Sequence, residues 1–215
     1  MPYGRVAFAN NHFYHVFNRG VEKRNIFLTD RDHERFLQTL YYYQFSGPKP
    51  KFSTYKRFKL QDFDKNSKIV DILCYCLIPN HFHLLLRQLR DGGIQEFIRK
   101  ASNSYTKYFN TKNKRVGPLF QGNFKAVTIE SEEQLVHVSR YIHLNPYVSK
   151  LVENLDFFKY SSYPDFIGLR NNTLCNKDII LNFFKSRKDY KSFVSDQKSY
   201  ALELEKIKHL LIEEF

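Results

Sequence analysis

Two short segments hold residues whose types and spacing could do chemistry together. His81 and His83 are separated by one apolar residue, and residues two apart in a β-strand point to the same face. Tyr141 stands four residues before Asn145, a spacing that places both side chains on one side of a helix. The first pair predicts half of a metal site, and the second offers a tyrosine hydroxyl near an amide. Read together, the two segments suggest a metal-dependent enzyme with a tyrosine as its nucleophile.

Each pair falls in an element that the surrounding sequence predicts. Residues 69–89 form two apolar, β-branched and aromatic runs interrupted by Pro79-Asn80, which is typical of a hairpin. A helix is expected from Ser131, whose hydroxyl can cap the first turn. Pro146 disfavours helical geometry in the residue before it, so the tyrosine pair should lie in the last turn. The apolar stripe of this helix is Leu135, Val138 and Ile142.

Plainer interpretations exist for the same residues. A histidine pair on an apolar strand is often a hydrogen-bonded, half-buried pair, and a tyrosine beside an apolar stripe is usually packing. A structural zinc site is another alternative, because a tight hairpin would place Cys74 and Cys76 on the histidine face, with Cys76 opposite His83. Buried cysteines, however, commonly behave as small apolar residues. Two other candidate nucleophiles, Tyr105 and Tyr108, lie on the apolar stripe of a helix, which favours packing.

Four segments closely resemble motifs of the single-tyrosine HUH transposases, especially the REP-associated tyrosine transposases. The name HUH denotes two histidines on either side of a hydrophobic residue. The motifs occur in the expected order and cover roughly residues 10–165, which makes the match specific. The segments are HVFNRG at 15–20, PNHFHLLL at 79–86, GPLFQGNFKA at 117–126 and YIHLNP at 141–146.

The resemblance implies a role for each residue of the two pairs. His81 and His83 would be the metal ligands, with Mg²⁺ or Mn²⁺ as the cofactor. Asn145 would occupy the position of a third ligand, which is glutamine in some relatives. Tyr141 would be the nucleophile, leaving a 5′-phosphotyrosine linkage and a free 3′-hydroxyl, and reversal would rejoin strands without ATP. Three basic residues are candidate phosphate contacts: Arg19, Arg115 and Lys125.

The predicted elements follow one another in the order of an α+β protein. Helices on one face of an antiparallel sheet are the economical packing for this order, and the resemblance implies a ferredoxin-like (RRM-like) core. Residues 1–150 are expected to form the catalytic domain, with a basic insertion at 46–68, and residues 151–215 a C-terminal helical extension. The expected strands lie near 13–18, within 69–89 and near 120–129, and the expected helices near 30–45, near 94–109 and from 131.

Composition and charge agree with a nucleic-acid partner. The 215 residues are 42% hydrophobic and 17% aromatic, which is enough for a folded core. The formal net charge of +12 implies a polyanionic partner. Nucleic acid is favoured over a membrane, because no apolar run approaches the roughly 20 residues of a membrane span. The expected partner is single-stranded or hairpin DNA.

The insertion at 46–68 interleaves basic and aromatic residues, a composition that suits the backbone and bases of single-stranded DNA. Lys56, Arg57 and Lys59 are the candidate contacts there, and a solvated insertion is an equal alternative. Residues 1–10 lack the apolar core of a signal peptide, and three cysteines fit a reducing compartment, so a cytoplasmic location is expected.

Two other functions fit the same sequence. A non-catalytic nucleic-acid-binding module would not need the two histidines and the tyrosine to converge. A metal-dependent nuclease that uses water would need the histidines alone. The sequence leaves open whether the protein is a monomer or a homodimer.

Overall fold

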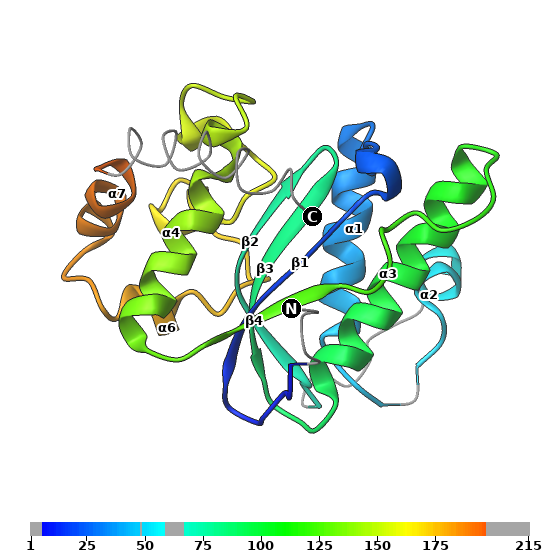
Figure 1. Ribbon diagram of the computed structural model, residues 1–215, viewed down its shortest axis with the longest axis horizontal. Helices are drawn as coiled ribbons and strands as arrows, with labels where there is room; N and C mark the ends of the chain where they lie inside the picture. The colour runs from blue at the N-terminus through cyan, green and yellow to red at the C-terminus, as the bar shows by residue number, and fades with distance from the viewer. Residues whose placement is uncertain (1–5, 48, 59–66, 197–215) are drawn as a thin grey trace.

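The computed structural model describes residues 6–47, 49–58 and 67–196. A four-stranded antiparallel sheet with strand order β2-β3-β1-β4 forms its centre (Figure 1). This order, with a helix after β1 and another after β3, is that of a ferredoxin-like core, so the expected α+β class is confirmed. The principal elements are β1 (Phe13–Arg19), α1 (Asp30–Tyr43), β2 (Val70–Ile78), β3 (His81–Gln88), α3 (Gly93–Lys112), β4 (Lys125–Ile129) and α4 (Glu132–Val148).

The expected hairpin is formed by β2 and β3, with Pro79-Asn80 as the turn. Its register pairs Cys76 with His83, as the tight turn predicts. On its other side β3 pairs with β1, and β1 pairs with β4. The outer edge of β2 is covered by residues 160–162, where Leu77 donates a backbone hydrogen bond of 2.9 Å to the Tyr160 carbonyl.

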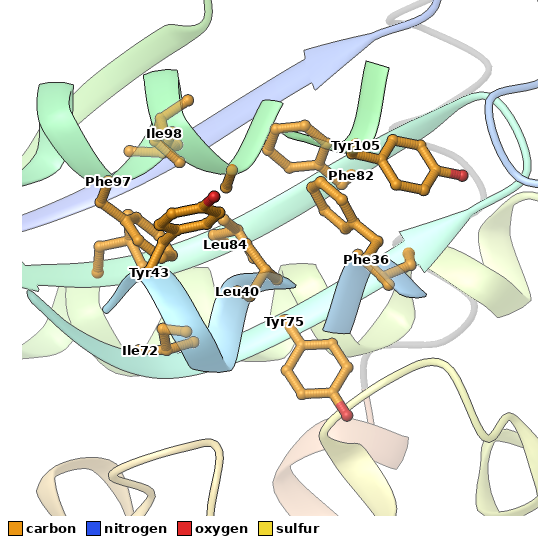
Figure 2. Packing of buried hydrophobic residues seen from close by; sticks show 14 of the residues in the cluster. Phe36, Leu40, Tyr43, Ile72, Tyr75, Phe82, Leu84, Phe97, Ile98 and Tyr105 are labelled. Carbon is orange, nitrogen blue, oxygen red and sulfur yellow. The ribbon is translucent and has the colours of Figure 1, made fainter. Parts of the chain in front are cut away.

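One face of the sheet packs against α1 and α3. Val16, Phe82 and Leu84 point to this face and are fully buried. The predicted apolar stripes of the two helices meet these strand residues, and Figure 2 shows Phe36 and Leu40 of α1 among them. These two helices therefore cover one face, as expected from the sequence.

The opposite face packs against α4, which corrects the expectation that the helices gather on one face. The buried cluster there joins Leu135 and Ile142 of α4 to Leu85 of β3. The physical reason is that the histidine side of the hairpin is also apolar, since Cys74 and Cys76 lie on it and are fully buried. Without α4 this second apolar surface would be exposed to water.

Helix α4 continues past Pro146 to Val148, so Asn145 begins the last turn as predicted, whereas Tyr141 lies one turn further inside the helix. Its start is as predicted, because the Ser131 hydroxyl accepts a hydrogen bond from the Gln134 backbone. Strand β4 is shorter than predicted, and Phe120 only forms an isolated bridge with Gly20.

The C-terminal segment extends the layer formed by α4, as Figure 1 shows. Phe166, Tyr190 and Val194 from this segment are fully buried in the same cluster as α4. Its short helices are η2 (Leu155–Phe157), α5 (Tyr163–Phe166), α6 (Asp178–Leu181) and α7 (Arg187–Ser195).

The basic insertion contains helix α2 (Phe52–Phe58), which packs on α1 through the buried side chain of Phe52. Lys59 lies outside the described residues. Across the described ranges, no helix combines the length and the apolar character that crossing a membrane requires.

Candidate active site

Three histidines point from the sheet toward α4. His81 and His83 lie two residues apart on β3 and face the same side, as the strand period predicts. Their rings are nearly perpendicular, with centroids 5.0 Å apart. His15 on β1 joins them, because its strand neighbour Phe17 is paired with His83. The rings of His15 and His83 have centroids 5.1 Å apart.

Each histidine of the predicted metal pair has a hydrogen bond at Nδ1. The His81 Nδ1 lies 2.6 Å from the Asn80 side-chain oxygen. The His83 Nδ1 lies 2.9 Å from the His15 Nε2, in a buried contact. Burial, together with the positive charge of Arg19, lowers the pKa of His81 to about 4. His81 is therefore neutral at physiological pH, the form in which an imidazole can bind a metal.

Tyr141 comes to this group from α4. Its ring meets the rings of His83 and His15 edge-on, with centroid distances of 5.6 and 5.8 Å. Asn145 is buried one turn later and donates a hydrogen bond of 2.9 Å from Nδ2 to the Tyr141 carbonyl. The helix therefore presents both residues of the predicted pair on the side of the sheet that carries the histidines.

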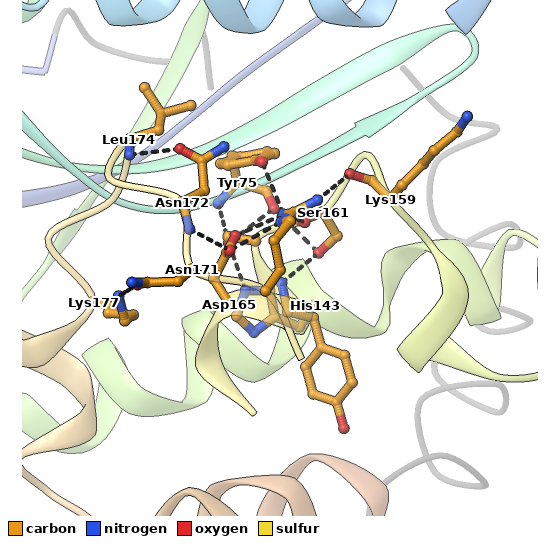
Figure 3. A network of polar contacts seen from close by, with 12 residues as sticks. Tyr75, His143, Lys159, Ser161, Asp165, Asn171, Asn172, Leu174 and Lys177 are labelled. Carbon is orange, nitrogen blue, oxygen red and sulfur yellow. Dashed lines mark hydrogen bonds and ion pairs between the residues drawn. The ribbon is translucent and has the colours of Figure 1, made fainter. Parts of the chain in front are cut away.

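A buried polar network holds α4 in this position (Figure 3). His143, two residues after Tyr141, has its Nδ1 2.7 Å from the Tyr190 hydroxyl and its Nε2 2.8 Å from the Ser162 hydroxyl. The Ser162 hydroxyl in turn accepts a hydrogen bond of 2.9 Å from the Tyr75 backbone on β2. Burial lowers the pKa of His143 to about 3. His143 is thus a neutral link between α4, the C-terminal segment and the sheet.

Two of the predicted basic residues lie beside the histidines. Arg19 is paired with His81 in the sheet and donates a hydrogen bond of 2.6 Å from Nε to the Gln121 side chain. Lys125 is paired with Phe17 and lies at the exposed start of the edge strand β4.

The other predicted basic residues lie elsewhere. Arg115 donates hydrogen bonds to the Asn110 side chain and the Pro118 carbonyl, in the loop after α3. Lys56 and Arg57 are exposed on α2, which belongs to the layer on the opposite side of the sheet from α4 (Figure 1). The five candidates that the structure describes therefore do not form one cluster around the histidines.

The alternative nucleophiles are remote from the histidine face. Tyr105 is buried in the α1–α3 core, where its hydroxyl donates a hydrogen bond of 2.5 Å to the Ile26 carbonyl. The Tyr108 hydroxyl donates one of 2.9 Å to the Asp32 carboxylate. Burial raises the pKa of Tyr108 to about 12 and that of Tyr105 further still. Both tyrosines are structural residues, as their place on the apolar stripe predicted.

The alternative interpretation, a structural zinc site that includes Cys74 and Cys76, is not supported in the described part of the chain. No group of three or more His, Cys, Asp or Glu side chains there has an arrangement that could hold a metal ion. Cys74 and Cys76 are fully buried with raised thiol pKa values, so they behave as small apolar residues. The remaining candidate ligand set is His81, His83 and the amide oxygen of Asn145.

His15 is the residue of this site that the sequence interpretation missed. It belongs to the predicted first strand and to the segment at 15–20, so both its strand and its motif were visible. Its role depends on the register between β1 and β3, which joins positions 68 residues apart. Strand alternation alone could have placed it on one face with Phe13 and Phe17, but not beside His83.

Comparison with known proteins gives a family and a fold. Residues 56–145 match the family described as "Transposase IS200 like", which confirms the resemblance. Among solved structures, a REP-associated tyrosine transposase bound to a REP hairpin is similar, with a TM-score of 0.54 and 14% identity over 78% of this chain and 86% of that chain. At this identity the likeness shows the fold.

A second structure, described as a transposase from Deinococcus radiodurans, is 14% identical over 66% of this chain and 95% of that chain. Its TM-score is 0.36. Comparison with the curated proteins found no match.

Proposed function

We propose that this chain acts as a transposase of the IS200-like family, which residues 56–145 match, and that it cleaves and rejoins DNA through a covalent bond to Tyr141. The observation that carries the proposal is the approach of the Tyr141 ring to His83, 5.6 Å between centroids, on a face of the sheet that the other tyrosine candidates do not reach. A binding module would have no need of this convergence, and a nuclease that uses water would have no need of the tyrosine.

In the proposed reaction the Tyr141 oxygen attacks the scissile phosphorus. A bond forms between this oxygen and phosphorus, the bond from phosphorus to the 3′ oxygen breaks, and the phenolic proton ends on the released 3′-hydroxyl. The products are a 5′-phosphotyrosine and a free 3′-hydroxyl. Attack by another 3′-hydroxyl reverses the step and rejoins strands, because the phosphotyrosine retains the energy of the phosphodiester bond.

We propose His81, His83 and Asn145 as the residues that bind a divalent metal ion. Mg²⁺ prefers a set of oxygen ligands, whereas softer metals prefer imidazole nitrogens. A set of two imidazoles and one amide oxygen is intermediate between these two kinds, so Mn²⁺ fits it better than Mg²⁺. When bound, the ion would polarise the scissile phosphate. The protein contributes two imidazoles whose Nδ1 atoms contact Asn80 and His15.

Single-stranded or hairpin DNA is the proposed substrate. The net charge of +12 favours a polyanion, and the similar solved transposase is bound to a hairpin. Arg19 ends β1 opposite His81, and Lys125 begins β4 opposite Phe17, so both could contact phosphates near the histidines. A single chain supplies both the histidines and the tyrosine of the site. We propose a cytoplasmic location for this activity, where such DNA is accessible.

The test of the nucleophile uses two tyrosines of the same helix. Labelled hairpin DNA is incubated with Mn²⁺ and either wild type, Tyr141→Phe or Tyr147→Phe, and covalent adducts are separated by denaturing electrophoresis. Tyr141→Phe should abolish the adduct, whereas Tyr147→Phe, at a half-buried position on α4, should retain it. A persistent adduct in Tyr141→Phe would overturn the proposal.

The metal requirement has its own test. Cleavage should stop in excess chelator and return with added Mn²⁺, and His81→Ala or His83→Ala should suppress it. Full cleavage by the chelated wild-type protein would exclude the proposed metal site while leaving the tyrosine chemistry open.

A further inference from the structure

The contact between His15 and His83 is a buried hydrogen bond between two imidazoles. His15 Nε2 and His83 Nδ1 are 2.9 Å apart, and both residues are less than a tenth exposed. The two rings are inclined by only 24°. One nitrogen must carry the proton and the other must accept it, because two lone pairs or two N–H groups at this distance would repel each other.

The direction of this hydrogen bond decides what the other nitrogen of His83 can do. If His83 Nδ1 carries the proton, its Nε2 has the lone pair and can bind a metal. If His15 Nε2 carries the proton instead, the neutral His83 has its own proton on Nε2 and cannot bind a metal there. The proposed metal site therefore requires His15 to be the acceptor.

His81 provides an internal comparison within the same site. Its Nδ1 faces the Asn80 side-chain oxygen at 2.6 Å, and an amide oxygen can only accept. His81 therefore has its proton on Nδ1 and its lone pair on Nε2. His81 and His83 would then both offer Nε2 to the metal ion. In each, the Nδ1 proton would be hydrogen-bonded to a residue outside the pair.

His15 does not act as a third ligand in this arrangement. Within the ranges that the structure describes, His15, His81 and His83 do not form a metal-binding group of three. His15 also meets the Tyr141 ring edge-on at 5.8 Å, so the rings of His15, His83 and Tyr141 all contact one another. His15 is therefore positioned to orient a metal ligand, His83, without binding the metal ion itself.

We propose that His15 is a positioning residue, which accepts a hydrogen bond from His83 Nδ1 and thereby holds His83 in the tautomer that binds the metal. The inference rests on the proposed function, since it takes His83 as a metal ligand. Outer partners of this kind typically change metal affinity by about 10- to 100-fold when they are removed.

The experiment measures Mn²⁺ affinity from the electron paramagnetic resonance signal of unbound Mn²⁺, without DNA. His15→Phe keeps an aromatic ring but removes the acceptor, and His15→Gln supplies a carbonyl oxygen that can accept from His83. His12→Phe is the matched control, because His12 is exposed just before β1 and contacts the Asn10 carbonyl. The His15→Phe variant should bind Mn²⁺ about 10- to 100-fold more weakly, the His15→Gln variant close to wild type, and the control unchanged.

Each contrary outcome has a distinct meaning. Wild-type affinity in a folded His15→Phe variant would overturn the inference and leave the proposed metal site intact. Absence of Mn²⁺ binding by the wild type would instead overturn the proposed metal site. If His15→Phe loses the native circular dichroism spectrum, His15→Met carries the same test with a more adaptable side chain.

Electron spin echo modulation of the bound Mn²⁺ separates an outer partner from a ligand. The wild type and His15→Phe should both show two directly bound histidine nitrogens. Three such nitrogens in the wild type and two in the variant would make His15 a ligand and overturn the positioning role.

Discussion

Asn145 donates a hydrogen bond from Nδ2 to the backbone carbonyl of Tyr141, one turn earlier in α4. The contact sets the orientation of the amide, because its NH₂ end faces the helix backbone and its oxygen must point away. A neutral oxygen in this position is a weaker metal ligand than an imidazole or a carboxylate. The residue that contacts the backbone of the proposed nucleophile is therefore also the weakest member of the proposed ligand set.

Asn145→Ala should reduce metal-supported cleavage less than His81→Ala does. We expect a loss of about tenfold, equivalent to about 1.4 kcal/mol in the barrier, since one weak ligand is removed and both histidines remain. Single-turnover cleavage rates over a Mn²⁺ titration would measure it, with higher Mn²⁺ recovering part of the loss. An effect as large as that of His81→Ala would make Asn145 an equal ligand.

Stability should depend on the protonation of His143. Its pKa is lowered to about 3 in the folded protein, from an ordinary value of 6.5, so the folded state favours the neutral ring. The contribution is fully present above pH 6.5 and is lost as the pH falls from 6.5 toward 3, by up to about 1.4 kcal/mol per pH unit.

Urea unfolding of wild type and His143→Gln at several pH values would test this dependence. The variant should be less stable at pH 7, because its amide cannot reproduce both contacts, to Tyr190 and to Ser162. The difference between the two proteins should then shrink below pH 6.5. Parallel stability curves would show that His143 does not titrate as described.

DNA binding should depend on salt mainly through the basic residues beside the histidines. Each phosphate contact on a single strand contributes about −0.7 to the slope of log affinity against log salt. Replacing Arg19 and Lys125 together with glutamine should therefore flatten the slope by about 1.4, if each contacts one phosphate. Fluorescence anisotropy of labelled hairpin DNA at several salt concentrations would give the slopes.

The same titration with Lys56→Gln and Arg57→Gln examines the insertion. We expect a smaller change, because α2 packs on α1, across the sheet from the histidine face. A change equal to that of the Arg19 and Lys125 pair would place bound DNA on the α2 side as well.

Tyr105→Phe should leave the covalent adduct intact but destabilise the fold. The Ile26 carbonyl would lose the buried hydroxyl that donates to it, which should cost about 1–3 kcal/mol. Chemical denaturation and the adduct assay together would check both parts. Loss of the adduct in a variant that remains folded would return Tyr105 to the list of nucleophiles.

The sequence predicted those parts of the fold that depend on local periodicity. Strand alternation placed His81 and His83 together, and the tight turn at Pro79-Asn80 predicted that Cys76 would pair with His83. The capping residue Ser131 correctly marked the start of α4. Each of these signals lies within a few residues of the feature that it predicts.

The errors concern relations between distant segments. The apolar stripe of α4 identified its buried side but not the sheet face that it covers, because both faces of the hairpin are apolar. The contact between His15 and His83 depends on the register of β1 against β3, and periodicity within either strand does not determine that register. The hydrogen bond between His143 and Tyr190 was not predicted either, because it joins segments 47 residues apart that no local pattern relates.

The interior position of β1 in the sheet affects how this protein can fold while the ribosome is still making it. The strand is made before both of its partners, because β3 and β4 follow it in the chain. Until then its two edges have no strand to pair with, a state in which nascent chains are prone to associate. Helix α4 also depends on a later segment, because His143 gains its contact with Tyr190 only after another 47 residues have been made. The proposed active site is therefore complete only after the segment that contains Tyr190 has been made, so a nascent chain that ends before Tyr190 lacks one of the contacts that hold α4 on the histidine face.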